Sequence, residues 1–255
     1  MATARRRQRF TGSENDVSTT SVDIANNRKI YTAILNSTKN DIATLREGLE
    51  KELKADAGMK ATWTAAKTWF ANHKPTYKTL QTSHPDEYHI ALITFTMDGF
   101  YDTFNQACRS IKNEKEAAVF RYRHYYKLLL YCIVHVRGNP PQVSKDLVVY
   151  RGCSASFPTV KVGSTFTFRQ FTSTSTNKEV ATGFSSGGTL FVIHDIMKAG
   201  LVTGKAMGIN SAPNIIGCNH HSLFDEDEFL MWSLEEFEVI HIVKTGENTE
   251  IHLRA

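Results

Sequence analysis

The spacing of apolar residues changes near Pro140 and Pro141, and this change limits the possible folds more than any other feature of the sequence. Before the two prolines, apolar residues recur every three or four positions, which is the spacing of one helix face. After them come short β-branched or aromatic runs, several of which alternate as strands do. The expected helices cover residues 42–70 in two segments, 88–110 and 116–136, and the expected strands cover residues 147–150, 164–171, 189–194, 229–232, 237–243 and 249–253. A helical half followed by a strand-rich half indicates the α+β class rather than a doubly wound sheet.

The same pattern predicts how the chain is organised. Residues 1–22 are polar and rich in Arg, Ser and Thr, so we expect a disordered tail. Residues 23–255 are expected to form a single domain, with a helical part at 23–145 and a strand-rich part at 146–255. No internal repeat is visible.

Composition excludes several classes of protein. The 255 residues are 41% hydrophobic and contain only four cysteines, which excludes a disordered chain and a disulfide-stapled miniprotein. The cysteines are too scattered for a zinc site, so we expect no metal. No run is long and apolar enough to predict a membrane span, and no apolar segment of a signal peptide follows the N-terminal arginines. The sequence therefore favours an intracellular protein.

The formal net charge of +4 is unevenly distributed along the chain. Residues 1–205 carry 28 basic and 17 acidic residues, whereas residues 206–255 carry 2 basic and 9 acidic ones. The basic body suits an anionic ligand, and the acidic segment suits a cationic one. Both could also be solvated surface, and the Arg-rich tail alone leaves a nucleic-acid binder as an alternative.

Three short motifs stand in the strand-rich half. An apolar strand at residues 147–150 leads into Arg151 and Gly152, and a hydroxyl-rich run occupies residues 171–175. Residues 226–228 form an E-x-E motif just before another strand. If that strand reaches back far enough, alternation places Glu226 and Glu228 on one face. Each motif alone is most simply a turn, a helix cap or solvated surface.

Taken in order, the three motifs resemble the R-S-E signature of arginine-specific mono-ADP-ribosyltransferases, found in vertebrate ecto-enzymes and bacterial toxins. Further segments are similar to the same family, namely residues 91–96, 104–105, 124–126 and 188–193. The resemblance implies an ADP-ribosyltransferase fold, in which a helical half packs on a two-sheet β core with an NAD cleft. It also implies that residues 23–255 are the catalytic domain.

The resemblance further implies roles for individual residues. Glu228 would hold the nicotinamide ribose and stabilise positive charge in an oxocarbenium-like transition state. Glu226 would orient an incoming guanidinium and assist its loss of a proton. Arg151 would meet the anionic part of NAD or brace the site. Ser173 would hold the carboxylate strand or the ribose in place.

Other positions are implied to contact NAD. Gly152, Thr174 and Ser175 belong to the same two motifs, and Phe184 matches a position whose ring packs on nicotinamide. A phenylalanine there is equally well explained as part of the core. The loop at residues 214–224, which includes His220 and His221, corresponds to the segment that touches the acceptor.

The sequence therefore predicts an enzyme that moves ADP-ribose from NAD to arginine on a protein acceptor. Arginine is expected because the first acidic position is Glu226, as in arginine-specific members, rather than glutamine. Two alternatives remain open: an NAD glycohydrolase with water as acceptor, and a non-catalytic binding module. We expect neither nucleic acid nor a membrane as a partner.

Overall fold

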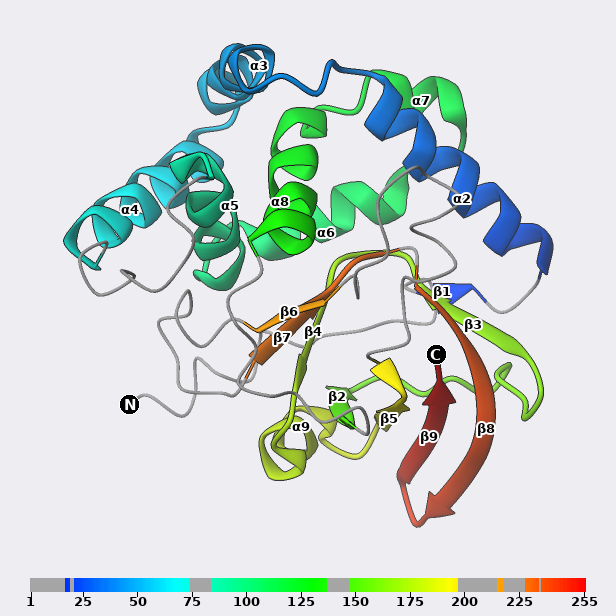
Figure 1. Cartoon of the computed structure of the whole chain (residues 1–255). Helices are drawn as coiled ribbons and strands as arrows, with labels where there is room; N and C mark the ends of the chain where they lie inside the picture. The colour runs from blue at the N-terminus through cyan, green and yellow to red at the C-terminus, as the bar shows by residue number, and fades with distance from the viewer. Residues whose placement is uncertain are drawn as a thin grey trace. The chain divides into compact units, whose positions relative to one another are not determined.

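The computed structural model describes residues 17–18, 21–73, 84–136, 147–196, 215–217, 228–233 and 235–255. Backbone contacts divide the chain into two compact units. The helical unit consists of Arg28–Pro141 and Ile216–Asp225, and the strand unit consists of Met1–Asn27, Gln142–Ile215 and Glu226–Ala255. The division after Pro141 lies close to the expected change from helices to strands. The α+β class is confirmed (Figure 1).

Helices make up the helical unit. They are α3 (Ile42–Ala55), α4 (Ala57–His73), α5 (Asp86–Thr96), α6 (Tyr101–Ser110), α7 (Glu114–Ala118) and α8 (Arg123–His135), while α2 (Ser21–Asn36) crosses the division between the units. No helix in the described part of the chain is long and apolar enough to cross a membrane.

Two helices expected from the sequence are each split in two. The expected helix at residues 88–110 ends at Thr96, since the backbone is extended at Met97, and Gly99 with a φ of 111° lies in the turn that leads to α6. The expected helix at residues 116–136 is interrupted by a turn between α7 and α8. The apolar spacing continues through both breaks, and the spacing alone therefore predicts one continuous helix at each place.

Helix α5 occupies the interior of the helical unit. It packs against both α4 and α8, and its residues 88–96 are all buried. A helix that is apolar around its whole circumference belongs inside a core. Beside it, the rings of Phe100 and Phe104 meet Tyr125 edge to face, with centroids 5.1 and 4.9 Å away.

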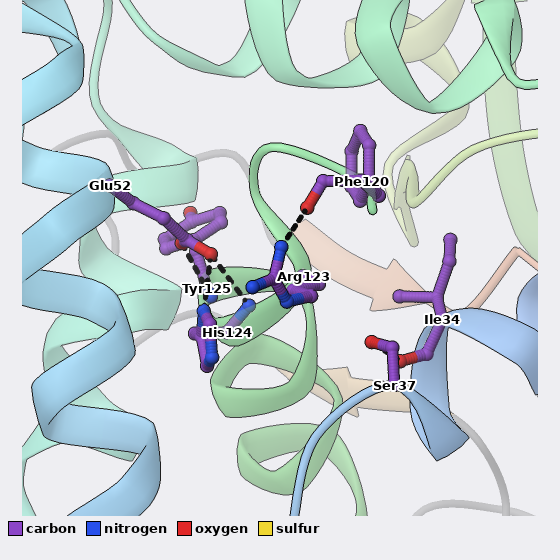
Figure 2. A network of polar contacts seen from close by, with 7 residues as sticks. All are labelled: Ile34, Ser37, Glu52, Phe120, Arg123, His124 and Tyr125. Carbon is purple, nitrogen blue, oxygen red and sulfur yellow. Dashed lines mark hydrogen bonds and ion pairs between the residues drawn. The ribbon is translucent and has the colours of Figure 1, made fainter. Parts of the chain in front are cut away.

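A buried carboxylate fixes where α8 begins. Glu52 on α3 accepts hydrogen bonds from the backbone N–H groups of His124 (2.9 Å) and Tyr125 (3.1 Å), as Figure 2 shows. The same carboxylate lies 2.7 Å from Nδ1 of the His124 ring. An anion at the first turn of a helix satisfies exposed N–H groups and complements the helix dipole. Glu52 is therefore a cap supplied by a neighbouring helix.

A buried cation, Lys127, caps the C-terminal end of a helix. Lys127 is 1% exposed, and its Nζ donates to the carbonyl oxygens of Leu35 and Thr38, both at 2.6 Å. These carbonyls lie at the C-terminal end of α2, where a positive charge is favourable. Burial lowers the pKa of Lys127 to about 8.

The strand unit holds most of a sheet that has nine strands in the described residues. These strands are β1 (Val17–Ser18), β2 (Val149–Cys153), β3 (Thr165–Phe168), β4 (Thr172–Ser175), β5 (Thr189–His194), β6 (Ile215–Gly217), β7 (Glu228–Met231), β8 (Glu236–Thr245) and β9 (Asn248–Arg254), of which β6 crosses the division between the units. Helices α2 to α8 lie between β1 and β2 in the chain, and α9 (Lys178–Ser185) lies between β4 and β5. The order is β1-β3-β8-β9-β5-β2-β4-β7-β6. Strands β5 and β9 pair in parallel, whereas β2 pairs antiparallel with both β4 and β5, and β8 with both β3 and β9.

The strands form one continuous hydrogen-bonded sheet, whereas the family resemblance implied a core of two sheets. The long strand β8 pairs with β3 through Glu236, Phe237 and Glu238, and then with β9 along the rest of its length. It therefore joins strands that would otherwise belong to separate sheets. A bulge between Val239 and His241 lies where the partner changes.

Other sequence expectations for the strand unit need correction. The expected strand at residues 164–171 is shorter: β3 ends at Phe168, a bend follows at residues 169–170, and a separate strand, β4, begins at Thr172. The expected tail at residues 1–22 overlaps β1 and the start of α2, so regular structure begins before residue 23. Helix α9 was not expected, because its eight residues are too few to establish a period.

Candidate functional site

The sheet brings the three sequence motifs together. Arg151 lies on β2, Ser173 on β4 and Glu228 on β7, and these three strands are consecutive in the sheet. Ser175 of β4 is directly opposite Glu228 of β7 and is also the partner of Tyr150 on β2. Tyr150, Ser175 and Glu228 therefore lie in one row across three strands, although 78 positions separate Tyr150 from Glu228 in the sequence.

Alternation along the strands separates the motif residues between the two faces of the sheet. Cross-strand partners share a face, so Tyr150, Ser175 and Glu228 lie on one side, and Ser173 joins them two residues before Ser175. Tyr150 packs against the cluster that contains Ala181 of α9. We call this side the α9 face; it carries two serine hydroxyls and the buried carboxylate.

Arg151 belongs to the other side of the sheet. It alternates with Tyr150 and shares a face with Val149 and Cys153, which are part of the main core of the strand unit. The residue is 4% exposed, and its Nη1 donates to the backbone carbonyl of Ser173 at 3.1 Å. Its guanidinium also lies over the ring of Phe168, 5.6 Å from the centroid. Arg151 thus joins β2 to the backbone of β4 at the serine.

The hydroxyls of the 172–175 strand have different partners. Thr174 lies on the face opposite Ser173 and Ser175, and its Oγ1 donates to the carbonyl of Phe229 on β7 at 3.0 Å. Ser175 Oγ accepts from the backbone N–H of Asn177 at 3.0 Å. Thr174 therefore ties β4 to β7, while Ser175 shapes the turn that leads into α9.

Helix α9 starts directly after this turn and lies close to β2. Asn177 caps it, accepting from the N–H groups of Glu179 and Val180. A Cβ on Gly152 would lie only 1.9 Å from the carbonyl oxygen of Ala181, so glycine is required for this approach. Phe184 is on the same helix and is 7% exposed. An open hollow of about 500 Å³ is lined by Thr176, Asn177, Lys178 and Glu179.

Glu228 is the first residue of β7 and is 3% exposed. The other half of the E-x-E motif, Glu226, lies outside the described residues, as do Asp225, Asp227 and the loop with His220 and His221. The expectation that Glu226 and Glu228 share a face therefore stays a prediction. Within the described ranges, no group of three or more His, Cys, Asp or Glu side chains is arranged to hold a metal ion.

Two residues of the site were missed at the sequence level. The sequence indicates Phe168, which lies under the Arg151 guanidinium, only as part of a strand, because a phenylalanine in a β run gives no sign of its polar neighbour. Asn177 could have been found. An asparagine before a run that includes Val180, Ala181 and Phe184 is a typical helix N-cap signal.

Comparison with known proteins points to one family. The family described as ART: NAD:arginine ADP-ribosyltransferase matches residues 31–202, well over half of the chain. No curated protein sequence matches the chain.

Solved structures with a similar fold include the eukaryotic mono-ADP-ribosyltransferase ART2.2, at 23% identity and a TM-score of 0.63, with 86% of this chain and 88% of that chain covered. Two mutants of ART2.2, one in complex with NADH and one with NAD, match with a TM-score of 0.64, the same identity and the same coverage. These likenesses support the ADP-ribosyltransferase fold expected from the sequence.

Proposed function

Because this chain belongs to the NAD:arginine ADP-ribosyltransferase family, we propose that it transfers ADP-ribose from NAD to arginine side chains of a target protein. The coarser activity, NAD-dependent ADP-ribosyl transfer, follows from membership of the family. The observation that supports the proposal most strongly is the arrangement of Arg151, Ser173 and Glu228 on three consecutive strands. NAD is a substrate of this reaction and is consumed in each turnover.

The first part of the proposed reaction breaks the bond between C1′ of the ribose and the nicotinamide nitrogen. The bonding electron pair leaves with nicotinamide, and C1′ acquires positive charge that it shares with the ring oxygen. Glu228 stabilises this charge. A carboxylate that is 3% exposed interacts more strongly with a nearby cation than one in water does, since little solvent screens it.

The second part joins a guanidinium nitrogen of the acceptor to C1′, and the nitrogen gives up one proton. A guanidinium hardly ever loses a proton in water. The reaction therefore requires a carboxylate that positions the guanidinium and accepts its proton as the bond forms. We assign this role to Glu226, two residues before Glu228. The neighbouring acidic residues of the segment add negative potential that attracts a cationic acceptor.

The remaining residues position the reacting groups. Ser173 lies on the same face as Ser175 and Glu228, so its hydroxyl can orient the ribose or the carboxylate strand. Arg151 holds the backbone of β4 through the Ser173 carbonyl, which favours the bracing role over direct contact with NAD. Phe184 is assigned to packing against nicotinamide, and Gly152 to the close approach of α9 that sets its position.

Two variants test the division of labour between the glutamates. The protein is incubated with NAD and a small guanidino acceptor, and released nicotinamide and the ADP-ribosylated acceptor are measured separately. Glu228→Gln should lower both by about 10²–10³-fold, because charge stabilisation of the transition state is lost. Glu226→Gln should abolish the conjugate but spare some nicotinamide release. Glu247→Gln, at an exposed turn residue, is the matched control.

The outcomes separate the competing functions. Nicotinamide release without any conjugate in the unmodified protein would indicate an NAD glycohydrolase, with water as acceptor. Equal loss of both products in the two variants would contradict the separate roles of Glu226 and Glu228. If the unmodified protein released no nicotinamide, a non-catalytic binding module would be the remaining explanation.

A further inference from the structure

The first described strand of the chain lies at the edge of the sheet, beside β3. Val17 of β1 is directly opposite Phe168 of β3, and the pairing is antiparallel. Val17 also packs against the main core cluster of the strand unit, of which Phe168 is a member. Directly opposite residues in a sheet point to the same side, so Val17 covers the outer flank of Phe168.

Phe168 is in turn held by other aromatic rings. Its ring meets Phe166 and Phe191 at centroid distances of 4.9 and 5.3 Å, in edge-to-face geometry. The ring of Phe237 lies 6.1 Å away, and the guanidinium of Arg151 lies over the Phe168 ring, 5.6 Å from its centroid. Because packed interiors transmit small displacements, a shift of the Phe168 ring changes the position available to Arg151.

Arg151 connects this aromatic group to the motif serine. Its Nη1 donates to the Ser173 carbonyl, and Ser173 lies two residues from the position opposite Glu228. A continuous series of contacts therefore runs from Val17 through Phe168 and Arg151 to the backbone of β4. Every member of the series belongs to the strand unit.

We propose that β1 is a positioning element of the enzyme: Val17 fixes the Phe168 ring, which holds Arg151 in the orientation that braces Ser173. This inference rests on the function proposed above and adds Val17 and Phe168 to the residues that determine its rate. Neither residue touches the reacting atoms. A strand of two residues contributes few backbone hydrogen bonds, so the apolar contact of Val17 dominates the effect.

The first test places a charge in this contact within the full chain. Val17→Asp should lower kcat for nicotinamide release by about ten-fold, since the contribution of a shielded cation–ring contact is of that order. KM for NAD should stay within about two-fold, because the affected groups position the site and do not bind the substrate. Val162→Asp is the matched control in the same unit, because Val162 is 60% exposed.

A second pair of variants separates positioning from simple loss of core packing. Phe168→Leu and Phe157→Leu remove rings of similar burial, 4% and 6% exposed, from the same core cluster. Both should lower Tm by similar amounts. Only Phe168→Leu should lower kcat at a temperature where both variants are fully folded, because only Phe168 carries the Arg151 guanidinium.

An NMR measurement tests the inference without using activity. The side-chain N–H signals of Arg151, assigned by their loss in Arg151→Lys, should exchange slowly in the unmodified protein because the residue is buried. Val17→Asp and Phe168→Leu should accelerate that exchange, whereas Val162→Asp and Phe157→Leu should not. Unchanged exchange and unchanged kcat in Val17→Asp would overturn the inference. If the unmodified chain released no nicotinamide, the proposed function would fail, while the exchange data would still decide whether β1 positions Arg151.

Discussion

Glu52 of the helical unit and Glu228 of the strand unit are both buried, and the two carboxylates have different surroundings. Glu52 is 7% exposed, and its carboxylate oxygens accept hydrogen bonds from backbone N–H groups in the first turn of α8 (Figure 2). Glu228 is 3% exposed and lies on a sheet face with Ser175 directly opposite. The first carboxylate fixes a helix end, and the second shares a sheet face with the side chains of Ser173 and Ser175. Burial alone therefore does not distinguish a capping carboxylate from the one proposed to act on NAD; the groups around each do.

The two units also differ in what surrounds a closely packed glycine, and substitution of these glycines gives the largest expected effect on stability. Gly152→Ala places a Cβ against the backbone of α9, whereas Gly48→Ala places one 2.1 Å from the His124 ring. A backbone cannot move aside as a side chain can, so Gly152→Ala should lower the free energy of unfolding by about 3 kcal/mol. Gly48→Ala should cost less, because His124 can rotate away from Glu52. Urea unfolding of both variants measures the difference; a larger cost at Gly48 would contradict this reasoning.

The two glutamates can be compared directly by making each neutral. Glu52→Gln removes a charged acceptor from the first turn of α8, so we expect a loss of about 2 kcal/mol in the free energy of unfolding. Glu228→Gln should change that free energy much less, since residues kept for activity seldom optimise stability. Thermal unfolding of both variants, together with nicotinamide release, checks the pair. If Glu52→Gln lowered kcat of the fully folded protein as strongly as Glu228→Gln does, the separate roles of the two glutamates would be contradicted.

A smaller effect should appear in the pH dependence of the helical unit. The pKa of Lys127 is lowered by burial to about 8, below the 10.5 of an exposed lysine. The unfolded chain therefore binds more protons between these values, and the free energy of unfolding rises with pH across that window. The contribution of Lys127 is at most about 1.4 kcal/mol per pH unit.

Urea unfolding at pH 8.0 and 9.5 measures this slope below the range in which tyrosines titrate. Lys127→Met should flatten the slope relative to the unmodified protein. Lys60→Met, at an exposed position of α4, should leave it unchanged. An identical slope in Lys127→Met and the unmodified protein would show that Lys127 does not titrate in this window.

Sequence patterns predicted the class of the fold better than the boundaries of its elements, and the roles of the site residues stay predictions. The change of period at Pro140 and Pro141 separates helices from strands because apolar spacing follows the geometry of each element. The breaks at Gly99 and between α7 and α8 were missed, because the core needs apolar residues on both sides of each turn. The row Tyr150, Ser175 and Glu228 could not be derived from spacing, since register depends on contacts between strands far apart in the chain.

The position of Arg151 gives the clearest example of what the sequence could not contain. The motif predicted that Arg151 would either meet NAD or brace the site. Its hydrogen bond to the Ser173 carbonyl and the Phe168 ring beneath it favour bracing. Both contacts depend on how β2, β3 and β4 lie in the sheet, and no local pattern records that arrangement.

The central claim is transfer of ADP-ribose to arginine, and paired peptides test it most directly. Two peptides identical except for one arginine or lysine are incubated with the protein and NAD, and mass spectrometry locates the modification. We expect ADP-ribose on the arginine peptide alone, and its loss in Glu226→Gln. Equal modification of the lysine peptide, or nicotinamide release with neither peptide modified, would contradict it.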